Sequence, residues 1–366
     1  MASHQNNTAL HPLISSSFWN LLALVARYGV EPRYLPRLFC LLPVTLLRQP
    51  VIAWERIRYD RRIARQAILP PIFVIGHWRS GTTHLQNLLC QDPQFARVTL
   101  MQAGMPNDFL TLGAFARRHV GQRLPSRRLM DNVPVAADVP WEEELALTST
   151  GRMSFYHVSF FPKAMGRIFQ EAVMFDGGSP ALESLWKEQY LAFLRKVQLV
   201  QPDRPLLLKN PANTARLRHL RRLFPGARFI HIHRNPYEVF ASSVHLYLKA
   251  QEAWGLHKTN REMVVRHVIE SYPVLMNAYL EQRTELEPDQ LAEVGFDALR
   301  ENPMQVLSDL YAQLRLPGFD DAAPRFEAYI ESQRDYRMNQ LSLPPEEREA
   351  VRAAWGPLFE RLGYPP

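Results

Sequence analysis

Short runs of consecutive apolar residues recur along the chain, separated by longer segments with apolar residues at helical spacing. The clearest runs are 72–75, 205–208 and 227–232, and weaker ones lie at 96–100 and 291–295. A short apolar run bounded by turn residues is typical of a strand buried on both faces of a parallel sheet. Strands that alternate with helices predict a P-loop-like, three-layer α/β/α fold with a central parallel sheet and a ligand at its carboxyl edge.

The first 69 residues are predicted to form an N-terminal helical extension, followed by a catalytic domain over residues 70–366. Within the extension, residues 13–66 show two or three amphipathic helices. Two apolar stripes define them: Phe18, Leu21, Leu22 and Val25, then Leu35, Leu38, Leu42 and Leu46. Further helices are predicted at 179–200, 214–224, 263–286 and 345–362, and the region from 100 to about 135, without sustained periodicity, is typical of a lid or an acceptor-binding segment.

The stretch from Ile52 to Ile63 places basic residues beside an apolar face. One interpretation is a helix lying on anionic lipid, which implies peripheral contact with the inner membrane face. The other, which we favour because ordinary amphipathic helices are far more common, is a helical hairpin packed on the catalytic domain. The apolar run 38–47 is shorter than the ~20 residues of a transmembrane helix, and Pro43 interrupts it.

The segment that begins at Ile72 predicts a strand, a tight loop and a helix. Gly76 and Gly81 copy the spacing at the start of a nucleotide-binding P-loop, but Thr82 stands where that loop has lysine. Backbone N–H groups at a helix N-terminus favour a phosphate, whereas the missing lysine disfavours a triphosphate. Arg79, inside the loop, offers a guanidinium to an anionic group.

Two further strand ends carry cations. Lys209 ends the strand at 205–209, and a charge at that end of a buried parallel strand indicates the ligand edge, although such a lysine is commonly just solvated. The strand at 227–233 leads to Arg234, after which Asn235 is predicted to cap a helix that begins at Pro236.

Three consecutive acids, Glu142 to Glu144, follow Asp138 and Pro140. We predict that Asp138 caps a helix with these acids in its first turn, where the helix dipole would account for them. A catalytic role accounts for them equally well. Successive side chains on a helix point about 100° apart, so at most two can face a cleft, with Glu142 aimed inward more than Glu143 and Glu144 intermediate.

Together these segments resemble the sulfotransferases that use 3′-phosphoadenosine-5′-phosphosulfate (PAPS), in particular their bacterial and tyrosyl-protein-type branch. The family's phosphosulfate loop, [PK]-[RK]-S-G-T-T, is matched by Arg79 to Thr83, with Trp78 in place of the usual proline. The family's R-[DN]-P-x-x-x-x-x-S segment is matched by Arg234 to Ser242. The resemblance spans residues 70 to 363, with softer matches at 140–147, where the bacterial branch has an acidic P-x-E-[DE]-E-x-A-L segment, and at 291–303 and 335–339.

The resemblance implies in-line transfer of the sulfuryl group of PAPS to a hydroxyl, or less readily an amine, of the acceptor. Thr82 and Thr83 are implied to cap the loop helix and bind the 5′-phosphate, and Arg234 and Ser242 to bind the 3′-phosphate. The implied PAPS-binding residues are Arg79, Ser80, Gly81, Thr82, Thr83, His84, Arg234, Ser242 and Arg337.

Arg79 and Lys209 are implied to serve the bridging and non-bridging oxygens, so that no metal is expected. The acidic base of the tyrosyl-protein branch lies shortly after the loop helix, where this chain has Thr99 to Met101. Glu142 and Glu144 are therefore the candidate catalytic bases, followed by His157 and His84.

The amino-acid composition limits the classes of binding partner and the cellular compartment that can be expected. The chain has 366 residues, a formal net charge of +7 and no Lys/Arg-rich run, so an anionic ligand or surface is expected but no nucleic acid. Cys40 and Cys90 are too few for a disulfide framework, and the N-terminus lacks the pattern of a signal peptide, so a cytoplasmic protein is expected. Oligomeric state has no signal in the sequence.

The acceptor is expected to be a small-molecule or lipid-like alcohol, because of the apolar N-terminal helices and the aromatic segment 155–161, although such a segment is commonly core. Two other functions stay open. A P-loop kinase is disfavoured by Thr82 and by the lack of a clear magnesium-binding aspartate at a strand end, and the third candidate is a PAPS-binding protein without catalysis.

Overall fold

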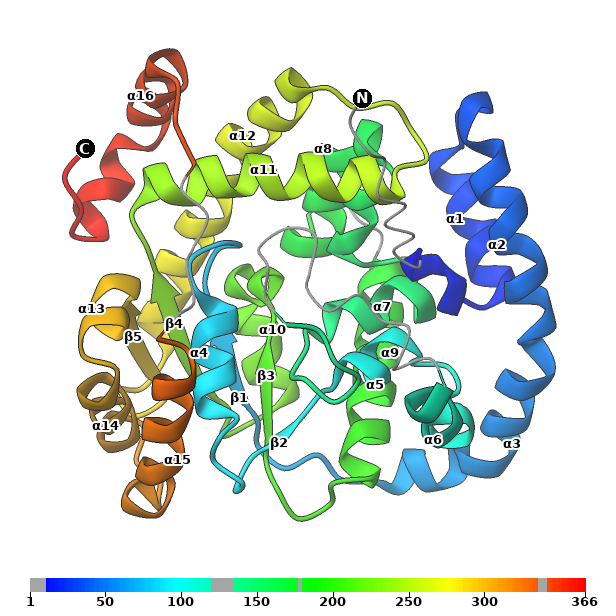
Figure 1. Ribbon diagram of the computed structural model, residues 1–366, viewed down its shortest axis with the longest axis horizontal. Helices are drawn as coiled ribbons and strands as arrows, with labels where there is room; N and C mark the ends of the chain where they lie inside the picture. Colours follow the sequence, from blue (N-terminus) through cyan, green and yellow to red (C-terminus); the bar gives the residue numbers. More distant parts are fainter. Residues whose placement is uncertain (1–10, 120–133, 177–179, 335–340) are drawn as a thin grey trace.

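The computed structural model describes residues 11–119, 134–176, 180–334 and 341–366. Five parallel strands form its centre in the spatial order β2-β3-β1-β4-β5 (Figure 1). They are β1 (Ile72–Ile75), β2 (Ala96–Arg97), β3 (Leu206–Lys209), β4 (Arg228–His233) and β5 (Leu291–Gly295). Because β1 lies between β3 and β4, the carboxyl ends of these three strands meet at one edge of the sheet.

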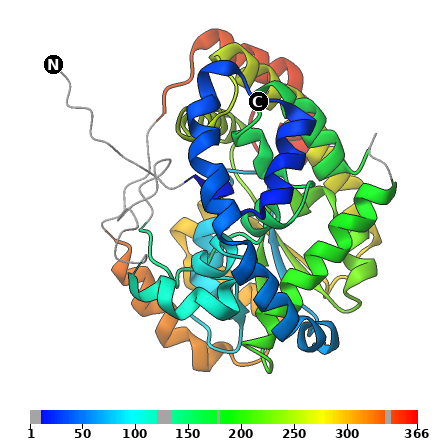
Figure 2. The same cartoon turned by 90° about the vertical axis from the view of Figure 1, so that its right-hand side faces the viewer.

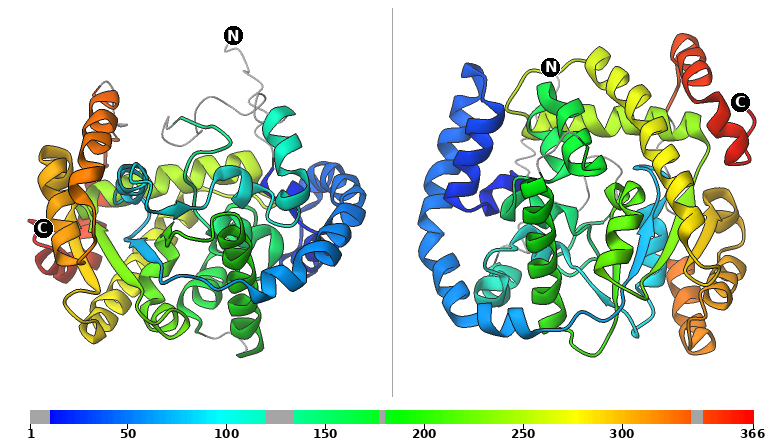
Figure 3. Two further views of the ribbon diagram at one scale, coloured as in Figure 1. Left: turned by 90° about the horizontal axis from the view of Figure 1, so that it is seen from below. Right: turned by 180° about the vertical axis from the view of Figure 1, so that it is seen from behind.

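Helices cover both faces of the sheet, which confirms the predicted three-layer α/β/α fold. Alternate residues of β1 point to opposite faces: Ile72 and Val74 join one hydrophobic cluster, and Phe73 and Ile75 another. The first cluster includes α4 (Thr82–Leu89), α13 (Phe296–Glu301), α14 (Pro303–Gln313) and α15 (Phe319–Ser332). The second includes α9 (Pro180–Leu199), α10 (Leu217–Leu223), α11 (Pro236–Trp254), α12 (Arg261–Gln282) and α16 (Pro345–Arg361). Figure 3 shows the orange helices α13–α15 on one side of the sheet and α9 and α12 on the other.

Three N-terminal helices form a layer at the right-hand edge of Figure 1, as the apolar stripes predict. They are α1 (Phe18–Tyr28), α2 (Leu35–Leu47) and α3 (Gln49–Arg65). Leu24 and Leu41 belong to the same hydrophobic cluster as Phe73 of the sheet, so this layer shares the core of the catalytic part. The division at residue 69 stays a prediction.

No single helix in the described ranges is both long and apolar enough to cross a membrane. Only when taken together do the segments Pro32–Leu47 and Gln49–Arg65 have the length and apolar composition of a membrane-spanning segment. The two are bent by 42° relative to each other. Pro43 does not break α2 but lies inside it.

The prediction of an irregular segment after residue 100 is wrong up to residue 119, where the structure has α5 (Leu100–Gly104) and α6 (Phe109–His119). Thr99 and Gln102 form a capping box that ends the preceding strand early and starts α5. The two helices are too short for a clear apolar period. Residues 120–133 lie outside the described ranges.

The remaining helices are short. They are α7 (Glu144–Thr150), α8 (Met165–Phe169), the 3₁₀ turns η1 (Pro12–Ser15), η2 (Pro32–Tyr34), η4 (Phe155–Ser159), η5 (Pro162–Ala164), η7 (Pro211–Ala215) and η8 (Arg283–Glu285), and the π-helical turn η6 (Gln170–Met174). The predicted helix 214–224 is thus divided between η7 and α10.

Candidate functional site

The loop between β1 and α4 lies against the neighbouring strand and helix so closely that two positions accept only glycine. Gly76 has φ +141°, and a Cβ there would lie 2.2 Å from the carbonyl oxygen of Ile232. Gly81 has φ +102°, and a Cβ there would lie 2.3 Å from the ring of Phe296. The Gly76 N–H donates to Oγ1 of Thr214 (2.8 Å), which anchors the start of the loop. The loop is therefore a tight cradle with its backbone drawn close to β4 and α13.

Arg79 joins this loop to α11. Its backbone has φ +72°, a left-handed conformation that is uncommon for a residue with a side chain and that tends to be retained at functional sites. Its Nε donates to Oγ of Ser242 (2.8 Å), so the two predicted phosphate segments are in direct contact. Ser80 is buried, with its hydroxyl donating to the carbonyl of His77 (2.7 Å).

The predicted capping of α4 by Thr82 and Thr83 is wrong. The N-cap is Gly81, and no side chain caps the helix. Thr82 and Thr83 are instead the first two residues of α4, because the left-handed glycine starts the helix one residue earlier. His84 follows them, and burial lowers its pKa below the ordinary value of 6.5.

Arg234 follows β4 on the other side of the loop. Asn235 caps α11 as predicted, accepting from the N–H of Tyr237 (3.0 Å), and Pro236 begins the helix. The guanidinium of Arg234 forms an ion pair with Glu238 and lies 4.6 Å from the centroid of the Phe296 ring. The ring of Phe296 in α13 thus lies over Gly81 and against the guanidinium of Arg234. It holds the loop and the Arg234 side chain close to α13.

Lys209 ends β3 directly beside β1, where it is the register partner of Val74. Its ammonium group is almost fully buried and forms an ion pair with Glu142. The other carboxylate oxygen of Glu142 accepts from the hydroxyl of Tyr156. A cation, a carboxylate and a phenol therefore form a continuous chain of contacts at the carboxyl edge of the sheet, buried at Lys209 and Glu142 and half-buried at Tyr156.

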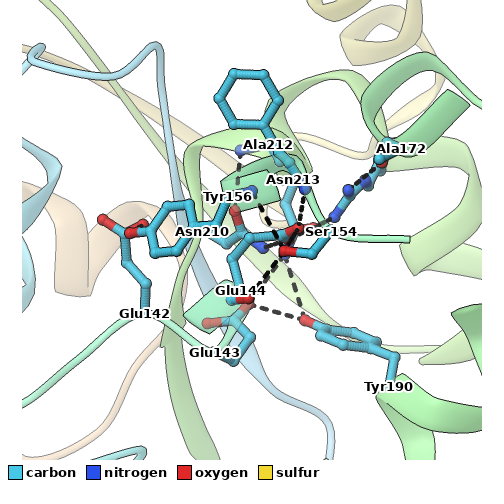
Figure 4. Close-up of polar contacts among 12 residues, drawn as sticks. Glu142, Glu143, Glu144, Ser154, Tyr156, Ala172, Tyr190, Asn210, Ala212 and Asn213 are labelled. Atoms are coloured by element: carbon cyan, nitrogen blue, oxygen red, sulfur yellow. Dashed lines mark hydrogen bonds and ion pairs between the residues drawn. The ribbon is translucent and has the colours of Figure 1, made fainter. Parts of the chain in front are cut away.

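Glu144 lies in a different environment. Its carboxylate forms a buried ion pair with Arg216 (3.1 Å) and accepts from Nδ2 of Asn210 (2.6 Å). The hydroxyl of Ser154 (3.0 Å) and the N–H of Phe155 (2.7 Å) donate to it as well. Figure 4 shows Glu142 beside Tyr156 and turned away from this cluster.

Glu143 is fully buried and accepts from the hydroxyl of Tyr190 (2.9 Å) and from Nδ2 of Asn213 (3.1 Å). Burial, with smaller contributions from the neighbouring carboxylates Glu144 and Glu142, raises its pKa from 4.5 to about 7, against the hydrogen bond from Tyr190. This carboxyl group is thus readily protonated near neutral pH.

The prediction of three acids in one helical turn capped by Asp138 is wrong. Helix α7 begins only at Glu144, and Asp138 is exposed and paired with Arg117 (3.2 Å). The reason is a short antiparallel pairing: the N–H of Trp141 donates to the carbonyl of Val98 (2.9 Å), which keeps this stretch extended. Glu142 therefore reaches Lys209 from a loop.

The structure brings most of the predicted site residues together along three neighbouring strand ends, and Glu144 lies apart from them with Arg216. Arg337 lies outside the described residues. His157 is fully buried, its Nε2 is 3.3 Å from the carbonyl of Thr148, and burial lowers its pKa to about 4. Sequence reasoning missed the partners of the acids: Tyr156, Tyr190, Asn210, Asn213 and Arg216.

A glycine cradle after the first strand of a parallel sheet, with cations at the ends of both flanking strands, is typical of P-loop-like α/β proteins that bind phosphorylated ligands. The sequence profile of the family described as "Sulfotransferase family" matches residues 70–321. The chain is also 31% identical over 312 residues, 85% of its length and 80% of the relative's, to omega-hydroxy-beta-dihydromenaquinone-9 sulfotransferase Stf3 of Mycobacterium bovis and of Mycobacterium tuberculosis. The chain belongs to the sulfotransferase family and is an enzyme that transfers a sulfuryl group from a sulfonate donor.

Solved structures agree on the fold. The sulfotransferase STF9 from Mycobacterium avium superposes with a TM-score of 0.69 at 18% identity, covering 100% of this chain and 99% of the other. The sulfotransferase STF1 from Mycobacterium tuberculosis H37Rv has a TM-score of 0.57 at 18% identity, covering 93% and 89%. The match to STF9 covers the whole chain, so the likeness includes the N-terminal helical layer and is not confined to the sheet.

Proposed function

We propose that this sulfotransferase takes its sulfuryl group from PAPS and transfers it to the hydroxyl of a small, lipid-like alcohol. The observation that carries the proposal is the buried ion pair of Lys209 with Glu142 beside the loop that holds Arg79. It supplies a cation and a proton acceptor in contact, which is what in-line transfer to a hydroxyl needs.

PAPS binding is assigned to the two phosphate segments. The tight glycine cradle and the uncapped N-terminus of α4 suit the 5′-phosphosulfate, with Arg79 beside it. Arg234 and Ser242 suit the 3′-phosphate, since the contact between Ser242 and Arg79 brings both segments to one edge of the sheet. Ser80 in the loop and His84 in the first turn of α4 complete the proposed donor site, and Arg337 stays a candidate on sequence alone.

In the proposed reaction Glu142 removes the proton of the acceptor hydroxyl, and Tyr156 orients its carboxylate. Lys209 and Arg79 stabilise the negative charge that develops on the transferring and leaving oxygens. Glu144 is given a structural role rather than the catalytic one, because Arg216 and three hydrogen-bond donors already saturate its carboxylate. Lys209 and Arg79 together neutralise the developing charge, so the proposed mechanism uses no metal.

A hydrophobic acceptor is supported by the aromatic side chains beside this chain of polar groups. Trp78, in the loop, packs against Phe155 with ring centroids 4.1 Å apart and ring planes tilted by 31°, and Phe155 precedes Tyr156. The relative Stf3 is named for a menaquinone-derived alcohol, which agrees with a lipid-like substrate class. We place the enzyme in the cytoplasm, in line with its two free cysteines, one buried and one exposed.

Thermal unfolding with added nucleotides tests the donor. Adenosine 3′,5′-bisphosphate should raise the melting temperature, whereas adenosine 5′-phosphate and ATP with magnesium should raise it far less. Arg234→Ala should remove most of this preference, because a hydrogen bond to a charged phosphate contributes about 1.5–3 kcal/mol. Equal stabilisation of the wild type by nucleotides with and without the 3′-phosphate contradicts the assignment.

A second experiment tests the acceptor. Transfer of a radiolabelled sulfuryl group from PAPS to a panel of long-chain alcohols and matched amines identifies the acceptor class.

A further inference from the structure

The outward face of α2 is entirely uncharged. Its exposed residues recur every three or four positions, and they are Leu35, Pro36, Phe39, Cys40, Pro43, Leu46 and Leu47. The opposite face is also apolar, with Leu38 and Leu41 buried in the core. A surface helix of a water-soluble protein normally turns polar residues outward, so a helix whose outward face is apolar indicates a second apolar neighbour.

The apolar surface continues onto the adjoining helices. Trp19 of α1 is 71% exposed, and Trp54 and Ile57 of α3 are 58% and 80% exposed. Between α1, the end of α2 and α3 lies a groove of about 640 Å³, lined mostly by apolar side chains that include Trp19, Leu46 and Ile57, together with Gln49 and Arg56. Figure 2, in which the right-hand side of Figure 1 faces the viewer, shows these blue helices forming one outer layer. We call this surface the N-terminal face.

The positive charge of the protein is concentrated in the same helices. Between Pro12 and Gln66 there are nine arginines and three acidic residues, so this segment carries +6 of the formal net charge of +7. Six of the nine arginines are exposed: Arg33, Arg56, Arg58, Arg61, Arg62 and Arg65. The other 34 Lys and Arg residues of the chain are almost balanced by its other 33 acids.

Exposed tryptophan, leucine and isoleucine beside a row of arginines is the composition of helices that lie in a membrane interface. A second copy of the chain is the poorer occupant, because a self-complementary contact across this face brings two sets of arginines together. We propose that the N-terminal face docks on an anionic lipid membrane, with Trp54, Ile57 and the outward residues of α2 at the acyl boundary and the arginines of α3 at the headgroups. The inner face of the same helices packs on the catalytic part, so both interpretations left open by the sequence apply, one to each side of the layer.

Co-sedimentation of the purified full-length protein with lipid vesicles tests the apolar part. Binding is expected to phosphatidylcholine vesicles that contain phosphatidylglycerol and to be much weaker to phosphatidylcholine alone. The double variant Leu47→Asp/Ile57→Asp should lower the partition coefficient by about tenfold or more, because two charges then meet the acyl boundary. The matched control is Val200→Asp/Val274→Asp, two exposed apolar residues elsewhere on the molecule, which should bind as the wild type does.

A second pair of variants tests the charge. Arg58→Gln/Arg61→Gln/Arg62→Gln should lose the preference for phosphatidylglycerol, whereas Arg222→Gln/Arg300→Gln/Arg325→Gln, with three exposed arginines elsewhere, should keep it. Unchanged thermal unfolding and unchanged binding of adenosine 3′,5′-bisphosphate show that each variant is folded.

Three outcomes overturn the proposal: no binding to anionic vesicles, equal effects of the test and control variants, or a dimer in sedimentation velocity that Leu47→Asp/Ile57→Asp dissociates. The last outcome identifies a second copy as the occupant. The membrane proposal does not depend on PAPS as donor or on the acceptor, since vesicle binding is measured without either.

Discussion

Three neighbouring carboxylates in this enzyme differ in what their surroundings allow them to do. Glu142 contacts one ammonium and one phenol, and it lies where the loop, β3 and the aromatic pair Trp78–Phe155 come close. Glu144 is enclosed by Arg216 and three neutral donors, so any proton transfer would leave a buried cation without its partner. We therefore assign a catalytic role to Glu142 and a stabilising role to Glu144, although both are glutamates two residues apart.

The variants Glu142→Gln and Glu144→Gln should separate these roles. Glu142→Gln is expected to lower kcat by at least ~10²-fold while adenosine 3′,5′-bisphosphate still binds, because a positioned base contributes about 10²–10⁴-fold. Glu144→Gln should instead lower the free energy of unfolding by about 3–5 kcal/mol. Denaturant titrations and initial rates with saturating PAPS measure the two effects. A normal kcat for Glu142→Gln would contradict the assignment of Glu142 as the base.

Lys209→Ala tests the transition-state role of the lysine. It should cut kcat strongly and leave donor affinity nearly unchanged, since the lysine meets charge that develops during transfer. Glu142 becomes unpaired in this variant, so its binding of adenosine 3′,5′-bisphosphate and its melting temperature are recorded as well. Turnover equal to that of the wild type would leave Lys209 as a structural partner of Glu142 only.

Glu143 should make stability depend on pH. Its folded pKa of about 7 exceeds its ordinary value of 4.5, so the folded state holds a proton that the unfolded chain releases. This contribution is complete below about pH 4.5 and is lost as pH rises through about 7. Glu143→Gln, which mimics the protonated form, should remove a difference on the order of 3 kcal/mol between pH 5 and pH 8. Equal pH slopes for the variant and the wild type in urea titrations would contradict this.

Residues that act through their neighbours in sequence could be predicted, and those that act through distant partners could not. The loop at 76–81 and the segment that begins at Arg234 carry their geometry locally, in glycines, a cap and a proline. The contacts of Glu142 with Lys209 and of Glu144 with Arg216 join residues about 70 positions apart, and nothing in a single sequence indicates such pairing. Tyr156 was not predicted as a site residue because it lies in the aromatic segment 155–161, and such a segment predicts a hydrophobic core.

At the scale of elements, the loop between β1 and α4 depends on backbone space more than on side chains. Gly76→Ala should lower the free energy of unfolding by about 1–3 kcal/mol and weaken binding of adenosine 3′,5′-bisphosphate, because the added Cβ meets the backbone oxygen of Ile232. Gly356→Ala in α16 is the matched control: no atom lies within 4 Å of the added Cβ, and the helix should gain up to ~1 kcal/mol. Comparable binding by both variants would count against the loop as the donor cradle.

Elements with a strong apolar period were predicted well, and short ones set by capping were not. Helices α9, α12 and α16 lie within a few residues of their predicted bounds. Helix α5 was missed because the box of Thr99 and Gln102 specifies it rather than any periodicity. Helix α7 was placed too early because the backbone around Trp141 is held extended by pairing with Val98 and Thr99, more than 40 residues away in sequence.

At the scale of the whole molecule, buried ion pairs connect the N-terminal layer to the catalytic part. Lys196 of α9 pairs with Glu55 of α3, and Arg48 pairs with Asp108 (2.6 Å). Burial lowers the pKa of Lys196, and the nearby Glu55 opposes that effect, so the ammonium depends on its partner.

Glu55→Ala should therefore lower the free energy of unfolding by about 3–5 kcal/mol, because it leaves the buried Lys196 uncompensated. Glu262→Ala, which removes an exposed ion pair with Arg266, is the control and should cost less than ~0.5 kcal/mol. Urea unfolding followed by both tryptophan fluorescence and circular dichroism gives these values. A separate early transition of the N-terminal helices would show instead that residues 1–69 are an independent domain.

The central place of β1 in the sheet has a consequence for synthesis on the ribosome. Its partners, β3 and β4, are made only after about 130–150 more residues. At about 5–20 residues per second, a fully apolar strand waits on the order of 10 s before either neighbour exists. During that interval β1 and the outward side of α2 are both open to other nascent chains, and overproduction in a fast-translating host should favour inclusion bodies that slower translation or a holdase relieves.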